Sequence, residues 1–120
     1  MGYSYGRKSI EHKRTMHPDL QGIYDDAIEV MDNSIVWGYR GEAAQTEAFT
    51  NGNSKAPFPR SAHNRMPSRA GDSIPYPEGW KATREQFMLM QGILRGIAHK
   101  RGVRLKPLIE WDLAHIEMED

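Results

Sequence analysis

The chain has 120 residues, and its 16 basic and 16 acidic side chains give a formal net charge of zero at pH 7. At about 100–200 residues per domain, this length predicts one domain over residues 1–120, and the balanced charge disfavours nucleic acid as a partner. The absence of cysteine excludes disulfides, thiol catalysis and cysteine-ligated metals. Apolar runs are far shorter than the roughly 18 residues of a membrane span, so we expect no membrane insertion.

The first nine residues contain no apolar stretch typical of a secretory signal peptide. Met1-Gly2 opens like an N-myristoylation signal, but Gly6 stands where that signal requires Ser or Thr. The sequence therefore predicts a chain that is made and kept in the cytoplasm until something else releases it.

Three segments have the pattern of helices. Residues 18–31 place their apolar side chains on one continuous stripe, with Pro18 suited to the first helical position. Residues 41–50 are rich in alanine and are followed by Asn51-Gly52. Residues 81–101 form the longest helix, which Gly102 is expected to end. The core side of this helix is formed by Phe87, Met90, Leu94 and Ile97.

Three short segments, 34–37, 103–106 and 114–118, predict strands. In the last of them, alternation places Ala114, Ile116 and Met118 on one face and His115 and Glu117 on the other. Residues 51–80 hold five of the seven prolines and read as a long loop, which in a small domain is usually functional or disordered. The loop is basic and the C-terminal segment is acidic, so one interpretation is that the loop docks on this segment. The basic side chains of the loop also leave nucleic-acid binding as a disfavoured alternative. These side chains are Lys55, Arg60, Arg65 and Arg69.

Four polar residues form the candidate site. His63 and Asp72 lie in the long loop, His115 lies in the final strand, and Asp112 precedes it by three residues. Two histidines and an aspartate can hold zinc and leave its fourth position for a water, which the ion then activates. The spacing alone also fits histidines at the surface or held by hydrogen bonds, because no His-Glu-x-x-His helix is present.

A series of short motifs follows one order along nearly the whole chain. The motifs are Tyr5-Gly-Arg-Lys-Ser9, Met16-His-Pro-Asp-Leu20, Trp37-Gly-Tyr-Arg40, Gln45, Gly52-Asn-Ser-Lys55, Ser61-Ala-His63, Ala70-Gly-Asp72 and Asp112-Leu-Ala-His115-Ile-Glu117. This series resembles the L-alanyl-D-glutamate endopeptidases of phage endolysins and bacterial cell-wall lysis, which are relatives of the VanY-type D-alanyl-D-alanine carboxypeptidases. In that family the last three motifs together form the zinc signature.

The resemblance implies that His63, Asp72 and His115 bind one Zn²⁺, that Asp112 is the catalytic base, and that Arg40 contacts a substrate carbonyl or carboxylate. It implies an α+β fold of the DD-peptidase/Hedgehog-like kind, with a small antiparallel sheet, helices on one face and an open metal-binding cleft. The implied substrate is the peptidoglycan stem peptide, cleaved at L-Ala–D-Glu. The implied enzyme is a monomeric bacteriophage endolysin that leaves the host cytoplasm through a membrane pore and degrades the cell wall.

Two departures from the family pattern keep alternatives open. Eight residues rather than the usual six separate His63 from Asp72, and Ala114 replaces the proline usual before the last histidine. A catalytically degenerate phage structural or wall-binding relative would tolerate both changes, and D,D-carboxypeptidase specificity would use the same metal centre. We expect Ser61 to order the loop through a turn hydrogen bond and Glu117 to orient a ligand. Three aromatic residues are expected either in the core or along a cleft: Trp37, Tyr39 and Trp80.

Overall fold

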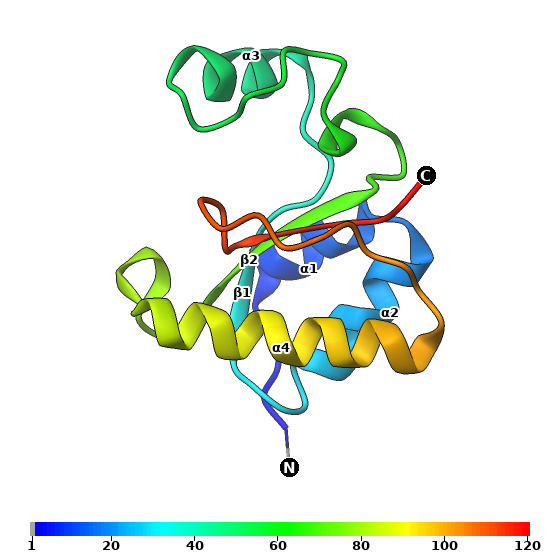
Figure 1. Cartoon of the computed structure of the whole chain (residues 1–120), viewed down its shortest axis with the longest axis vertical. Helices are drawn as coiled ribbons and strands as arrows, with labels where there is room; N and C mark the ends of the chain where they lie inside the picture. The colour runs from blue at the N-terminus through cyan, green and yellow to red at the C-terminus, as the bar shows by residue number, and fades with distance from the viewer. Residues whose placement is uncertain (1) are drawn as a thin grey trace.

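A three-stranded antiparallel sheet lies at the centre of the computed structural model, which describes residues 2–120 (Figure 1). The strands β1 (Asn33–Trp37), β2 (Ala70–Pro75) and β3 (His115–Glu117) lie in the order β1-β2-β3. The helices are α1 (Arg7–Arg14), α2 (Pro18–Ala27), α3 (Glu42–Thr50) and α4 (Arg84–Arg101), with short 3₁₀ turns η1 (Ala62–Asn64) and η2 (Gly79–Lys81). This architecture confirms the expected α+β fold with a small antiparallel sheet.

The strand register brings three side chains of different strands into one row. Trp37 of β1 lies opposite Asp72 of β2, and Asp72 lies opposite His115 of β3. Residues that lie opposite one another in antiparallel strands point to the same face of the sheet. The neighbours of His115 on β3 confirm the predicted alternation, because Ala114 and Ile116 are buried in the core on the other face.

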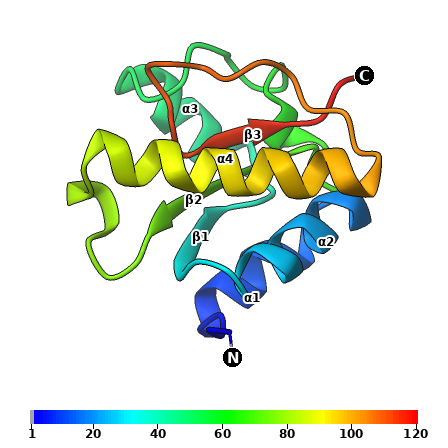
Figure 2. The same ribbon diagram turned by 60° about the horizontal axis from the view of Figure 1, so that its bottom comes forward.

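The helices α2 and α4 cover one face of the sheet, and α3 lies on the other side (Figures 1 and 2). Leu20, Ile23 and Tyr24 of α2 pack with Met90 and Leu94 of α4 in a single core cluster. The Thr83 hydroxyl caps α4 by accepting a hydrogen bond from Gln86 N, so this helix begins three residues later than predicted. Gly102 ends it with a positive φ of 73°, as expected.

Two predicted elements are wrong in extent. The helix predicted over 18–31 ends at Ala27, and the chain continues to Met31 in tight turns, in which the amides of Glu29 and Val30 bond to carbonyls three residues back. Residues 103–106 form no strand: Leu105 makes one isolated bridge to Met118. Pro107 follows, and since proline has no amide hydrogen, it cannot extend the ladder.

Two elements were not predicted as such. The helix α1 is polar and buries only Ser9, so no apolar stripe in the sequence indicates it. The Ser9 hydroxyl accepts a hydrogen bond from Ile35 N on β1. The central strand β2 lies inside the segment interpreted as a long loop. Its Gly71 leaves no room for a side chain, because an added Cβ would lie 2.7 Å from the Tyr24 hydroxyl and 2.8 Å from Met16 Cε. Among residues 2–120, no helix is both long and apolar enough to cross a membrane.

Candidate metal centre

His63 lies on η1, above the open face of the sheet. The Ser61 hydroxyl accepts a hydrogen bond from His63 N, and Asn64 Oδ1 accepts one from Ser61 N, which closes a capping box around this short turn. The ring of His63 is fully buried, and its Nδ1 lies 2.8 Å from the carbonyl oxygen of Gly38. Because a carbonyl only accepts hydrogen bonds, we assign the proton to Nδ1, and the lone pair of Nε2 remains free for a ligand.

Asp72 lies between the two histidines. Its Oδ2 is 3.3 Å from His63 Nε2, and its Oδ1 is 3.0 Å from His115 Nδ1. The opposite ring nitrogen of His115, Nε2, lies 3.0 Å from Glu117 Oε1, and Glu117 Oε2 forms an ion pair with Lys106 at 2.8 Å. One ligand atom from each of His63, Asp72 and His115 lies within 4.8 Å of the other two.

These donors fit a metal ion. Within the described chain, His63 Nε2 is buried and has no hydrogen-bond partner, although it faces the Asp72 carboxylate. A lone pair and a carboxylate repel each other unless a proton or a cation lies between them. Ligands at about 2.0–2.2 Å from a tetrahedral zinc lie about 3.4 Å apart, close to the 3.0 and 3.3 Å that separate Asp72 from the two histidines.

The charges around the cluster also favour a cation. Burial opposes ionisation of Asp72, but its interactions with both histidines hold its pKa well below the usual range. Burial by itself would lower the pKa of His115, yet hydrogen bonds to Asp72 and Glu117 raise it to about 10. Burial, followed by the charge of Asp72, raises the pKa of Asp112. Positive charge is therefore stabilised where the carboxylates converge.

Arg40 is held beside the cluster by a buried polar network. The main-chain amide of Arg40 donates to His63 O at 2.7 Å, and its Nε donates to Gln45 Oε1 at 2.7 Å. Gln45, on α3, is fully buried and donates through Nε2 to Ser54 Oγ and to the Ala56 carbonyl oxygen. Within residues 2–120, no protein acceptor pairs with the two terminal amino groups of Arg40, so they are available for a ligand.

A cleft opens over the cluster and has two adjoining cavities, of about 600 and 260 Å³. The larger cavity is lined by Ala44, Glu47 and Ala48 of α3 and by Trp80 of η2. Both cavities are lined by Arg40, Asn53, Asp72, Trp111 and Asp112. The helices α2 and α4 on one face of the sheet and the cleft on the other match the arrangement expected from the sequence, whereas α3 lies on the side of the cleft.

The same fold is found in the solved structure of the Serratia marcescens L-Ala D-Glu endopeptidase ChiX. The TM-score is 0.77 and the sequence identity is 22%, over 97% of this chain and 90% of that chain. The two chains share a fold. No family model matches the chain, and no curated protein matches its sequence. The fold implied by the sequence resemblance is therefore confirmed by structural similarity.

All five site residues proposed from the sequence line the smaller cavity: Arg40, His63, Asp72, Asp112 and His115. Ser61 makes the expected turn hydrogen bond, and Trp37 and Trp80 line the larger cavity.

Sequence reasoning missed the roles of two further residues at the site. Trp111 lines both cavities and is 57% exposed, and its position next to Asp112 was the available signal. Gln45 is one of the motifs on which the family resemblance rests, but nothing in the sequence indicates that its side chain holds Arg40.

Proposed function

We propose that this chain is a zinc-dependent peptidoglycan peptidase that hydrolyses the L-Ala–D-Glu bond of the stem peptide. The observation that carries the proposal is the buried cluster of His63, Asp72 and His115, which shares one cleft with Asp112. The likeness to a solved L-Ala D-Glu endopeptidase supports the same substrate class. In this proposal the three clustered residues hold one Zn²⁺.

When bound, Zn²⁺ supplies a Lewis acid that polarises a carbonyl and acidifies a water. The protein prepares both histidines for this role. The Gly38 carbonyl holds the Nδ1 proton of His63, which leaves Nε2 as the ligand atom. Glu117 accepts a hydrogen bond from Nε2 of His115, which turns Nδ1 toward Asp72. Such outer partners fix the tautomer and the orientation of a ligand.

Asp112 and Arg40 complete the proposed chemistry. Asp112 would accept a proton from the attacking water and return it to the leaving amine as the peptide bond breaks. A carboxyl whose pKa is raised by burial suits this task, because it must carry the proton between the two steps. The terminal amino groups of Arg40 would donate hydrogen bonds to the carbonyl oxygen as negative charge develops on it. The buried contact with Gln45 fixes the guanidinium in place.

The test is digestion of purified cell walls by the zinc-loaded protein, followed by mass spectrometry of the released fragments. We expect released peptides that begin with D-Glu, and glycan strands whose lactyl groups carry only L-Ala. The matched control is His63→Ala, which removes a ligand atom and should abolish release. Released D-Ala would instead identify a D,D-carboxypeptidase, and walls left intact by a protein that binds them would identify a non-catalytic relative.

The proposal also includes the route to the substrate. An endolysin of this kind would act as a monomer and would reach the wall from the host cytoplasm through a membrane pore. Lysis of cells that express the chain only when a pore-forming protein is co-expressed would support this route.

A further inference from the structure

The two halves of the cleft differ in chemistry. Apart from the residues shared with the smaller half, the larger half is lined by Trp37, Trp80 and small or polar residues. Glu47 is the one charged side chain among these unshared lining residues. Trp80 is 65% exposed and stacks on Phe87, with ring centroids 6.5 Å apart. Trp111, at the junction of the halves, adds a further exposed indole. Away from the shared residues, the larger half is thus an aromatic surface with a single charged side chain.

The smaller half is basic. Lys55 and Arg60 line it. Of the described residues that line this half and not the larger one, the one acidic side chain is Glu117, which is paired with Lys106 and His115. Arg60 and Glu117 also line a third cavity of about 290 Å³, which extends this half toward the C-terminal residues. That cavity carries the further cations Arg65, Arg69 and Lys106, against the single additional acid Asp120.

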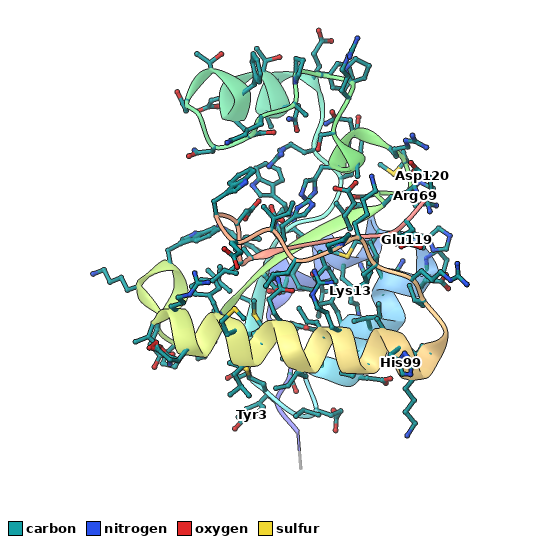
Figure 3. All side chains as sticks on the ribbon, viewed as in Figure 1. Tyr3, Lys13, Arg69, His99, Glu119 and Asp120 are labelled. Atoms are coloured by element: carbon teal, nitrogen blue, oxygen red, sulfur yellow. The ribbon has the colours of Figure 1, made fainter. Side chains whose placement is uncertain are left out.

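The turn that carries Trp80 and the turn that follows Arg60 lie apart across the sheet, whereas Lys55 lies nearer the junction of the halves, with its Nζ 4.7 Å from the centroid of the Trp111 ring. In Figure 1, the yellow-green turn that carries Trp80 lies at one side of the sheet, and the green turn η1 that follows Arg60 lies at the other. Figure 3 shows Arg69 beside Glu119 and Asp120 at the edge on the η1 side. Asp72 and Asp112 belong to both cavities, so a substrate cleaved at this centre extends into both halves.

The substrate has a matching asymmetry. In a peptidoglycan stem, the nitrogen of L-Ala is acylated by the lactyl group of an uncharged amino-sugar chain. D-Glu is linked through its side-chain carboxyl and so keeps a free α-carboxylate, directly beyond the bond that would be cleaved. Sugar C–H groups pack on the faces of indole rings, which carry partial negative charge, and carboxylates pair with guanidinium and ammonium groups.

We propose that the cleft binds the stem peptide in one direction. The saccharide and L-Ala lie in the half formed by Trp37 and Trp80, and the α-carboxylate of D-Glu lies in the half formed by Lys55 and Arg60. This assignment rests on the proposed function, since it concerns the two sides of the same scissile bond. It makes Trp80 and Arg60 specificity-determining residues, each for one end of the substrate.

The test compares two pairs of substrates. The first pair is a disaccharide–tripeptide and the sugar-free tripeptide N-acetyl-L-Ala-γ-D-Glu-L-Lys, which keeps the nitrogen of L-Ala acylated. The second pair is this tripeptide and its analogue in which the α-carboxyl of D-Glu is an amide. Each is digested by zinc-loaded wild type, Trp80→Ala and Arg60→Gln, and kcat/KM is measured. Tyr3→Ala and Arg14→Gln are the controls, because both residues are exposed and line none of the cleft cavities described.

We expect Trp80→Ala to lower kcat/KM about tenfold on the disaccharide substrate and less than about twofold on the sugar-free peptide, the loss typical of one well-packed contact. Arg60→Gln should lower it about tenfold on the carboxylate peptide and less than about twofold on the amide, since a bond to a charged group is lost only there. Both controls should behave as wild type.

Three outcomes would overturn the assignment, and they are distinguishable. If the Trp80→Ala loss is the same with and without the sugar, the aromatic half does not hold the saccharide. If the Arg60→Gln loss is the same for the carboxylate and the amide, the basic half does not hold D-Glu. In both cases wild-type cleavage would leave the proposed function standing. If zinc-loaded wild type cleaves none of the substrates, the proposed function fails, and the orientation fails with it.

Discussion

Replacing Gln45 by leucine tests whether the buried network holds Arg40. The substitution removes Gln45 Oε1, which accepts hydrogen bonds from Arg40 Nε at 2.7 Å and from Asn64 Nδ2 at 3.2 Å. It also removes Gln45 Nε2, which donates to Ser54 Oγ at 2.9 Å and to Ala56 O at 2.6 Å. Each buried polar partner left without a bond costs about 1–3 kcal/mol. Asn64 keeps its bond to Arg40 O, and Ala56 O keeps a long bond from Ser54 Oγ at 3.5 Å. The loss is therefore complete at Arg40 Nε and partial at Ala56 O.

Two complete losses would lower the free energy of unfolding by about 2–6 kcal/mol. The bond that Ala56 O keeps places the expected decrease in the lower part of that range, with a fall in Tm on the order of 10 °C for a chain of this size. Urea and thermal unfolding, followed by circular dichroism with the metal removed by a chelator, measure this without a contribution from metal binding. Thr46→Ala is the matched control, because Thr46 is the next residue of α3 and is exposed.

The same variants separate stability from positioning. Gln45→Glu keeps an acceptor for Arg40 Nε but places a carboxylate against the Ala56 carbonyl oxygen. It should therefore be destabilised while it retains more wall-hydrolysing activity per folded molecule than Gln45→Leu. A Gln45→Leu variant within about 0.5 kcal/mol of wild type would refute the reasoning, since surface substitutions typically fall in that range.

The remaining predictions concern the metal and the catalytic base. Alanine in place of His63, Asp72 or His115 should remove most of the zinc measured by metal analysis, because two ligands hold the ion weakly; full zinc in His63→Ala would exclude that ligand. Asp112→Asn should keep its zinc while turnover falls by roughly 10²–10⁴, and Glu117→Gln should lose only about 10–100-fold; the reverse order would make Glu117 the base. Zinc at 100 times its Kd should stabilise the fold by about 2.7 kcal/mol, so equal Tm values with and without chelator would contradict zinc binding.

The sequence predicts those elements whose apolar side chains recur at the spacing of an amphipathic helix or strand. The stripe of α4 and the alternation around His115 on β3 are confirmed, because amphipathic elements must turn one face to the core. β2 has no such period, since all six of its residues are buried, the polar Asp72 and Ser73 included. Gly71, its second residue, is required by the close approach of Tyr24 and Met16, which no local sequence pattern reveals.

The cluster of site residues was visible as a series of motifs, but its geometry was not. Strand pairing brings His115 beside Asp72 across 43 residues of sequence, and the turn η1, which precedes β2, places His63 beside them. Glu117, which holds His115 from two residues away, was expected from the sequence, whereas the group that holds His63 is the main-chain carbonyl of Gly38, 25 residues away. Carbonyl groups carry no residue identity, so sequence alone could not indicate this partner.

The longer segment between His63 and Asp72 does not disturb either residue, because each end is anchored separately. Arg65, Met66 and Pro67 form an exposed bulge. Ser68 then returns to the core, where its amide donates to Thr15 O and its carbonyl accepts from His17 N.

These bonds fix the start of β2 on the turn between α1 and α2, whereas η1 is fixed through its bonds to Arg40 and Gly38. The carbonyl of Ala114 accepts a hydrogen bond from Ser73 N at 2.9 Å. Proline has the same carbonyl acceptor, so alanine in its place keeps this contact. Both departures from the family pattern therefore fall on positions whose backbone contacts tolerate them, and they leave the relative placement of His63, Asp72 and His115 to the sheet and to η1.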